Sequence, residues 1–163
     1  MKSFRILPSI LTLLLLSFAL TSFAADPQPL EIGDPFPAIA GEDQHGVPYS
    51  VDGARYILVS FDMKSGKRAN AWFEGHGANY LPEHNAVFVA NIHGMPSIGR
   101  FFALPKMRKY PHRILLADEE GLLDDLPRED GKISVFTLNQ EGRIENIGFW
   151  KPDFEEPLPP IKE

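Results

Sequence analysis

Three continuous apolar runs, rich in β-branched residues, stand out along the chain at positions 57–63, 86–92 and 114–117. None of them alternates cleanly between apolar and polar positions, so each is typical of a strand that is buried on both faces of a sheet. The segments between them have helical composition, over 68–81 and again after Pro96, which suits a first helical position. Strands that alternate with helices predict a layered α/β domain with a mixed sheet.

Two further segments have the character of β-hairpins. Residues 41–51, GEDQHGVPYSV, predict a short hairpin that turns at Gln44-His45-Gly46, and residues 132–150 predict a second one that turns at Glu141-Gly142. The last residues are Pro-rich and acidic. Because Pro157, Pro159 and Pro160 would interrupt a helix there, we expect a tail rather than a terminal helix.

The chain divides into three parts, and its 163 residues suffice for one domain with its own core. Lys2 and Arg5 precede an apolar run that ends in small residues before Ala24, which is the pattern of a secretory signal peptide over 1–24. An uncleaved anchor is the alternative. We expect a domain over 25–150, a tail over 151–163, a periplasmic or secreted location, and no stable membrane anchor after cleavage.

Charge and cysteine content narrow the possible functions. The net charge is −6, and removal of Lys2 and Arg5 leaves 14 basic against 22 acidic residues, or 14 − 22 = −8. Such a charge argues against nucleic-acid binding. The chain contains no cysteine. Disulfide bonds, thiol peroxidase chemistry, disulfide exchange and thiolate metal sites are therefore excluded.

The N-terminal half carries a family resemblance. Gly33, Pro35 and Pro37, followed by Asp43 and Gly46 and then by YILVSFDM, resemble the N-terminal signature of peroxiredoxin-like and TlpA-like thioredoxin folds. SVFTLNQEGRI resembles the hairpin after the cis-proline of that fold, so the resemblance extends over roughly residues 30–148. It implies a thioredoxin-like fold, with a mixed central sheet flanked by helices and an N-terminal β-hairpin.

A closer resemblance rests on residues 94–118, GMPSIGRFFALPKMRKYPHRILLAD. They are similar to the exported, cysteine-free YtfJ-like proteins, which are often labelled FAD/FMN-containing dehydrogenases. No G-x-G-x-x-G follows a strand here, and the chain leaves no room for a separate dinucleotide-binding domain. We therefore expect no cofactor, and we regard the flavin label as unsupported.

The chain departs from the thioredoxin pattern where the chemistry of that fold lies. The resemblance places Gly66 and Ala69 at the two cysteine positions, or Ser65 in place of Gly66 if the register shifts by one residue, and Ile133 at the cis-proline. We therefore expect no catalytic residue. Cysteines introduced at Gly66 and Ala69 are expected to lie within disulfide range, with Cα atoms less than about 7 Å apart.

Two basic segments are the candidate binding residues of this acidic chain. The first contains Lys64, Ser65, Gly66, Lys67 and Arg68, with Ser65 as the expected N-cap of a helix whose free N–H groups favour an anion. The second contains Lys106, Arg108, Lys109, His112 and Arg113. We expect both to form one surface for an acidic periplasmic protein or a small anion. The alternative is that they are solvated helix ends.

No metal site is expected, because none of the five histidines has ligand spacing. A soft copper site at His93 or His84 with Met63 or Met95 is the weaker alternative. Two function classes remain. The first is a non-catalytic binding or accessory module of unknown ligand, and the second is a cofactor-dependent oxidoreductase without catalytic thiols. The missing catalytic residues favour the first.

Overall fold

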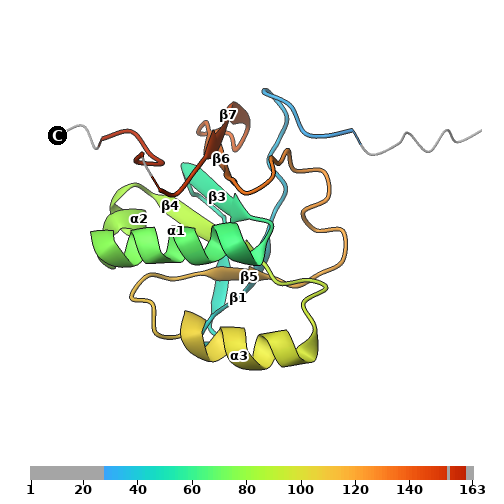
Figure 1. Cartoon of the computed structure of the whole chain (residues 1–163). Helices are drawn as coiled ribbons and strands as arrows, with labels where there is room; N and C mark the ends of the chain where they lie inside the picture. Colours follow the sequence, from blue (N-terminus) through green and yellow to red (C-terminus); the bar gives the residue numbers. More distant parts are fainter. Residues whose placement is uncertain (1–27, 154, 161–163) are drawn as a thin grey trace, which may run out of the picture.

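The computed structural model describes residues 28–153 and 155–160 and is built around one seven-stranded mixed sheet (Figure 1). The strands lie in the order β2-β1-β5-β4-β3-β6-β7. Their bounds are β1 Ala40–Asp43, β2 Pro48–Ser50, β3 Tyr56–Ser60, β4 Ala86–Asn91, β5 Leu115–Ala117, β6 Ile133–Leu138 and β7 Ile144–Trp150. The helices are α1 Met63–His76, α2 Tyr80–Glu83 and α3 Ser97–Met107.

The three strands that the apolar runs predict are the inner strands of the sheet. β3 and β4 are parallel, as are β4 and β5, while β6 joins β3 in the antiparallel direction. Leu58 and Val59, which are neighbours in β3, are both fully buried. Because adjacent residues of a strand point to opposite faces, both faces of β3 are covered. The α/β prediction is confirmed.

Both hairpins form the outer parts of the sheet. β1 and β2 pair antiparallel, and β1 also pairs antiparallel with β5. β6 and β7 pair around a turn in which Gly142 has φ +75°, a backbone conformation that favours glycine. The Asn139 side chain stabilises this turn by accepting hydrogen bonds from the N–H groups of Glu141 and Arg143.

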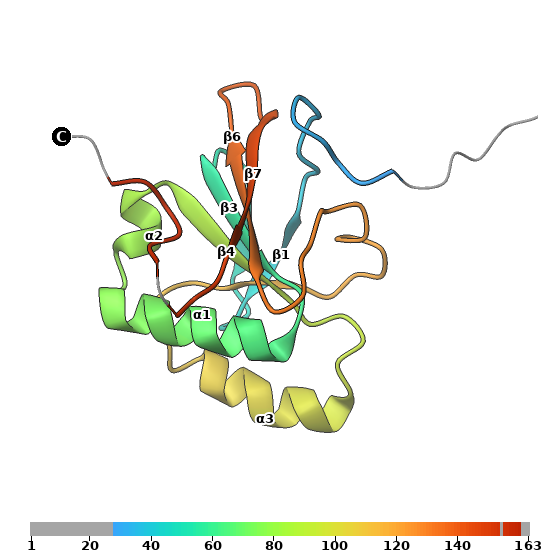
Figure 2. The ribbon, with the colours of Figure 1, turned by 45° about the horizontal axis from the view of Figure 1, so that its top comes forward.

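Two hydrophobic layers enclose the sheet. On one face lie the three helices, with Phe73, Leu81, Phe88 and Trp150 in the core between them and the strands. On the other face, the segment before β1 and the loop between β5 and β6 cover a second layer, which contains Ile39, Val51, Leu123, Leu126 and Phe136. Figure 2 shows α1 and α3 side by side on the helical face.

The first long helix begins earlier than its composition predicts. α1 starts at Met63 with Asp62 as its N-cap, so the prediction of Ser65 as the cap is wrong. The Asp62 carboxylate accepts the N–H groups of Lys64 and Ser65, which satisfies donors that a helix start leaves free. The helix ends at His76 with Gly77 as its C-cap, and the short α2 follows it as a separate element.

The described part of the expected tail packs on the helical face. Leu158 is 3% exposed within the core beneath α1, and the Trp150 indole donates a hydrogen bond to the Glu155 carbonyl. As expected, residues 151–153 and 155–160 form no helix. The predicted signal peptide lies outside the described residues. None of the helices that the structure describes is long and apolar enough to cross a membrane.

Candidate functional site

α1 begins at the carboxyl end of β3, the edge where parallel sheets place their ligand sites. The Asp62 carboxylate accepts hydrogen bonds from the backbone nitrogen of Lys64 at 2.9 Å, from the backbone nitrogen of Ser65 at 2.8 Å and from the Ser65 hydroxyl at 2.6 Å. Burial raises the pKa of Asp62, but these hydrogen bonds outweigh burial and lower it. The chain therefore holds its own carboxylate where the first basic segment was expected to hold an anion.

Gly66 and Ala69 lie inside α1 and are buried, not at its exposed start. A Cβ atom on Gly66 would lie 2.6 Å from the Ser60 hydroxyl, so glycine is needed for this close approach. Helical residues three apart have Cα atoms about 5 Å apart, which lies within the expected range of less than about 7 Å. A disulfide there would also have to bring the two Cβ atoms from about 5–6 Å to about 3.5–4.5 Å.

A cavity of about 70 Å³ lies between α1 and α3, next to the buried Gly66. It is too small for a flavin, because pockets for such ligands measure about 300–1,000 Å³. Its walls include Asp62, Lys67 and Asn70 from the α1 side, Asn91 and Met95 from the end of β4, and Met107 and Tyr110 from the α3 side.

The three methionines of the described residues, Met63, Met95 and Met107, all line this cavity. Met95 precedes α3 and Met107 ends it. Neither His93 nor His84 lines this cavity: His93 Nδ1 lies 3.1 Å from the Asp118 carbonyl, and His84 Nδ1 lies 2.8 Å from the Tyr80 carbonyl. Within the residues that the structure describes, no cluster of histidine and carboxylate side chains could hold a metal either.

The residues of the first basic segment have different environments. Lys64 and Lys67 are exposed and form no ion pair with a described residue, whereas Ser65 and Gly66 are buried. Arg68 forms an ion pair with Asp153, which ties the C-terminal segment to α1. Two of the five residues are therefore available to a partner as free cations.

The arginines of the second segment attach the first hairpin to the body of the domain. Arg108 donates to the Gln44 carbonyl at 3.0 Å, and Arg113 donates to the Asp43 carboxylate at 2.8 Å. The Arg113 guanidinium also lies 3.8 Å from the centre of the Tyr49 ring. Lys106 and Lys109 remain exposed, with no ion pair to a described residue.

His112 belongs to the core. It is 2% exposed, its Nε2 atom lies 2.9 Å from Asn70 Oδ1 on α1, and its Nδ1 atom has no hydrogen-bond partner. Burial lowers the pKa of His112 to about 4, so the ring is neutral at pH 7 and does not attract an anion.

Gln44 also takes part in the buried hydrogen bonds around His112, and the sequence analysis did not identify this role. Its side chain donates to the His112 carbonyl at 2.7 Å and accepts from the Ile114 N–H at 2.8 Å. No local pattern marks Gln44, because its partners lie far along the chain. Together with Asn70, it connects the first hairpin to α1 through His112.

The two basic segments lie on the same side of the sheet but are offset along the strands. Because β3, β4 and β5 are parallel, α1 starts at their carboxyl edge, while residues 108–113 lead into the amino edge of β5. Figure 2 shows α1 and α3 running alongside each other. The 70 Å³ cavity has Lys67 and Tyr110 in its walls but none of the five residues of the second segment.

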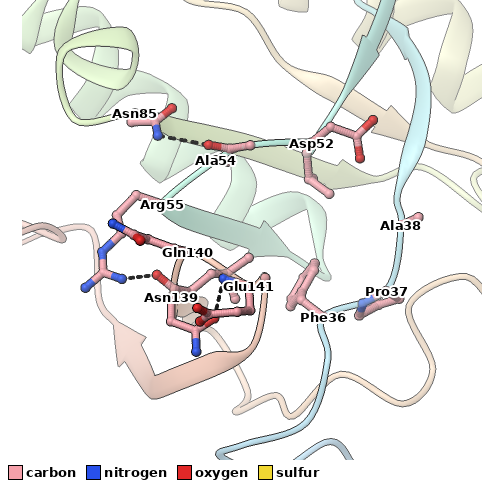
Figure 3. A pocket seen from close by; sticks show the side chains of 14 residues that line it. Phe36, Pro37, Ala38, Asp52, Ala54, Arg55, Asn85, Asn139, Gln140 and Glu141 are labelled. Atoms are coloured by element: carbon pink, nitrogen blue, oxygen red, sulfur yellow. Dashed lines mark hydrogen bonds between the residues drawn. The ribbon is translucent and has the colours of Figure 1, made fainter.

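A second hollow, of about 450 Å³, lies at the opposite edge of the sheet, by the start of β3 (Figure 3). Polar groups in its wall bond to one another. Asn85 donates to the Gly53 carbonyl at 2.9 Å, and Arg55 bonds to the Leu138 carbonyl and to Glu145. Asn85 adopts φ +51°, and its own carbonyl accepts from Arg55 and Tyr56. These contacts give the residues a structural role.

Comparison with known proteins relates the fold to solved structures. No protein-family profile matches the sequence, and no curated protein matches it. A Chlorobium tepidum structure described as a thiol:disulfide interchange protein DsbE aligns with TM-score 0.51 and 15% identity, over 76% of this chain and 89% of that one. The peroxidoxin BcpB of Mycobacterium tuberculosis aligns with TM-score 0.50 and 14% identity, over 76% and 90%. The chain has the thioredoxin-like fold and lacks its cysteines.

Proposed function

We propose that this protein is an exported, non-catalytic binding module on a thioredoxin-like frame, related to the YtfJ-like proteins. The observation that carries this proposal is the start of α1. The positions that correspond to the two cysteines, Gly66 and Ala69, are buried inside the helix, and the Asp62 carboxylate caps the helix start. A site with neither a thiol nor an open helix end has lost the means of thiol chemistry.

The binding face that we propose is the cavity between α1 and α3 and its rim. Lys64 and Lys67 lie on the α1 side of this face, free of ion pairs with described residues. Met63 and Tyr110 line the cavity and give it apolar and aromatic contact surface. Methionine adapts to different partners because its side chain is unbranched and polarisable. The partner is an acidic protein with a small side chain that enters the cavity.

Site-specific photo-crosslinking in the native compartment tests this proposal. A photoreactive residue at position 63 is expected to give a discrete crosslinked product with an acidic protein, and the same residue at Val47, which is exposed on the first hairpin, is the matched control. Lys64→Glu with Lys67→Glu is expected to remove the product, since it reverses the charge on this rim. Equal crosslinking from both positions would contradict the proposed face.

The competing function, a cofactor-dependent oxidoreductase without thiols, gives a different result. A protein purified from its native compartment would then show visible absorbance from a bound flavin or haem. We expect no such band and no reduction of insulin disulfides. A stoichiometric chromophore would replace the binding-module proposal with the oxidoreductase.

A further inference from the structure

α3 carries its apolar side chains on the outside of the molecule. Ile98, Phe101 and Phe102 are 67%, 70% and 60% exposed, and Pro105 is exposed as well. Their spacing of three, four and seven residues places them on one face of the helix. A surface helix normally turns such a face toward the core.

The opposite face of α3, which meets the protein, is less apolar. It contains Gly99, Arg100 and Ala103, and only Met107 is buried. The Arg100 guanidinium donates to the Met95 and Ile92 carbonyls, both at 3.1 Å, and pairs with Asp118. α3 is thus attached through Leu104 and Met107 and through these polar bonds, while its outward apolar residues contribute little to the fold.

On the outward face, Phe101, Phe102 and Pro105 line a shallow hollow of about 790 Å³ together with Lys106 and Lys109. The Phe101 and Phe102 rings contact each other edge to face, with centroids 5.3 Å apart, and both remain open to solvent. At these exposed fractions, two phenylalanines and one isoleucine offer roughly 350–400 Å² of apolar surface. A stable protein–protein interface takes about 800 Å² from each partner. The area therefore favours a shallow, reversible contact over a stable dimer.

The charges around this face indicate which kind of surface it binds. No aspartate or glutamate occurs between Glu83 and Asp118, although the chain holds 22 acidic residues. Lys106 and Lys109 follow Phe102 by four and seven residues and form no ion pair with a described residue. A symmetric dimer through α3 would bring these like charges together. An anionic surface that accepts apolar side chains suits both the exposed apolar residues of α3 and the lysines beside them.

We propose that α3 docks reversibly on an anionic lipid bilayer. Ile98, Phe101 and Phe102 enter the boundary between headgroups and acyl chains, while Lys106 and Lys109 contact lipid phosphates. This contact uses the outer face of α3 and does not depend on the binding face proposed for Lys64 and Lys67.

Vesicle co-sedimentation tests the proposal, with the purified chain and every variant sharing one N-terminus, confirmed by mass spectrometry. Vesicles of equal parts phosphatidylglycerol and phosphatidylcholine are expected to bind the protein, and pure phosphatidylcholine to bind it much more weakly. Phe101→Ser with Phe102→Ser is expected to weaken binding at least about tenfold. Lys106→Glu with Lys109→Glu should weaken it and reduce its sensitivity to salt.

Two control variants make the result specific. Val47→Ser removes an apolar side chain that is 50% exposed on the first hairpin, and it should leave vesicle binding unchanged. Lys64→Glu with Lys67→Glu should also leave vesicle binding within about twofold, even though it removes the proposed protein partner. No binding to anionic vesicles, or equal binding by the phenylalanine double variant, would overturn the proposal. A wild-type dimer that the same double variant dissolves would overturn it in favour of a second copy.

Discussion

α1 and α3 lie beside each other on the same face of the sheet, yet they relate to the core in opposite ways (Figure 2). α1 directs Ala69 and Phe73, both fully buried, into the core and begins at a side-chain cap. α3 buries only Met107, has no side-chain cap and exposes two phenylalanines. The difference shows that two helices of one layer can have different roles. α1 packs into the core and stabilises the fold, whereas α3 exposes apolar side chains to solvent.

The largest test of this contrast substitutes one phenylalanine in each helix. Phe73→Ala removes a ring that contacts Phe88, Trp150 and His112, so it is expected to lower the free energy of unfolding by about 3–5 kcal/mol. Phe101→Ala is expected to change it by less than about 0.5 kcal/mol. Urea denaturation of both variants measures these values. Similar losses would show that α3 belongs to the core.

The second test uses the pH dependence of stability, because α1 packs against the buried His112. The pKa of His112 is about 4 in the folded chain and near its ordinary 6.5 when unfolded. Between those values the unfolded chain binds a proton that the folded chain does not, so stability falls as pH drops from 6.5 toward 4, by about 3 kcal/mol in total.

Urea titrations between pH 7.5 and 5, above the range where most carboxylates titrate, isolate this effect. His112→Gln should flatten the pH dependence, whereas the exposed His45→Gln should keep it. An unchanged slope in the His112 variant would assign the pH dependence to other groups.

The third test concerns the close approach of Gly66 in α1 to Ser60 in β3. Gly66→Ala places a methyl group against the Ser60 hydroxyl and is expected to cost about 1–3 kcal/mol. In a Ser60→Ala background that oxygen is absent, and the same change should be neutral or stabilising, since alanine favours helix. A double-mutant cycle measures the coupling between the two sites. Additive effects would mean that Gly66 is not fixed by this contact.

The smallest expected effects concern the two helix starts. Asp62→Ala removes the α1 cap and should cost about 1 kcal/mol. Pro96→Ser introduces a capping hydroxyl at α3, where no side chain caps the helix, and should add a few tenths of a kcal/mol. Thermal unfolding of both variants compares them. A loss at both helices would indicate that Pro96 already stabilises the start of α3 by other means.

The sequence predicted the inner strands because a strand covered on both faces needs a continuous apolar run. It did not predict the start of α1. Asp62 and Ser65 are both suitable cap residues by type, and the structure uses Asp62. It also misplaced His112, whose partners Asn70 and Gln44 are distant in the chain.

The candidate site was predicted less well than the fold, for a related reason. A run of basic residues does not reveal which of them are used internally. Arg68, Arg108 and Arg113 each bond to a residue at least 64 positions away. Periodicity likewise shows that α3 has an apolar face, but it does not show that this face points outward.

The attachment of the last residues to α1 has a practical consequence. Leu158 and the Arg68–Asp153 pair hold the C-terminal segment over the Trp72–Trp150 aromatic cluster. A protease that cuts after residue 150 would strip this cover and leave indole rings facing water. The shortened product would be prone to self-association, so the intact C-terminus protects the solubility of the whole chain.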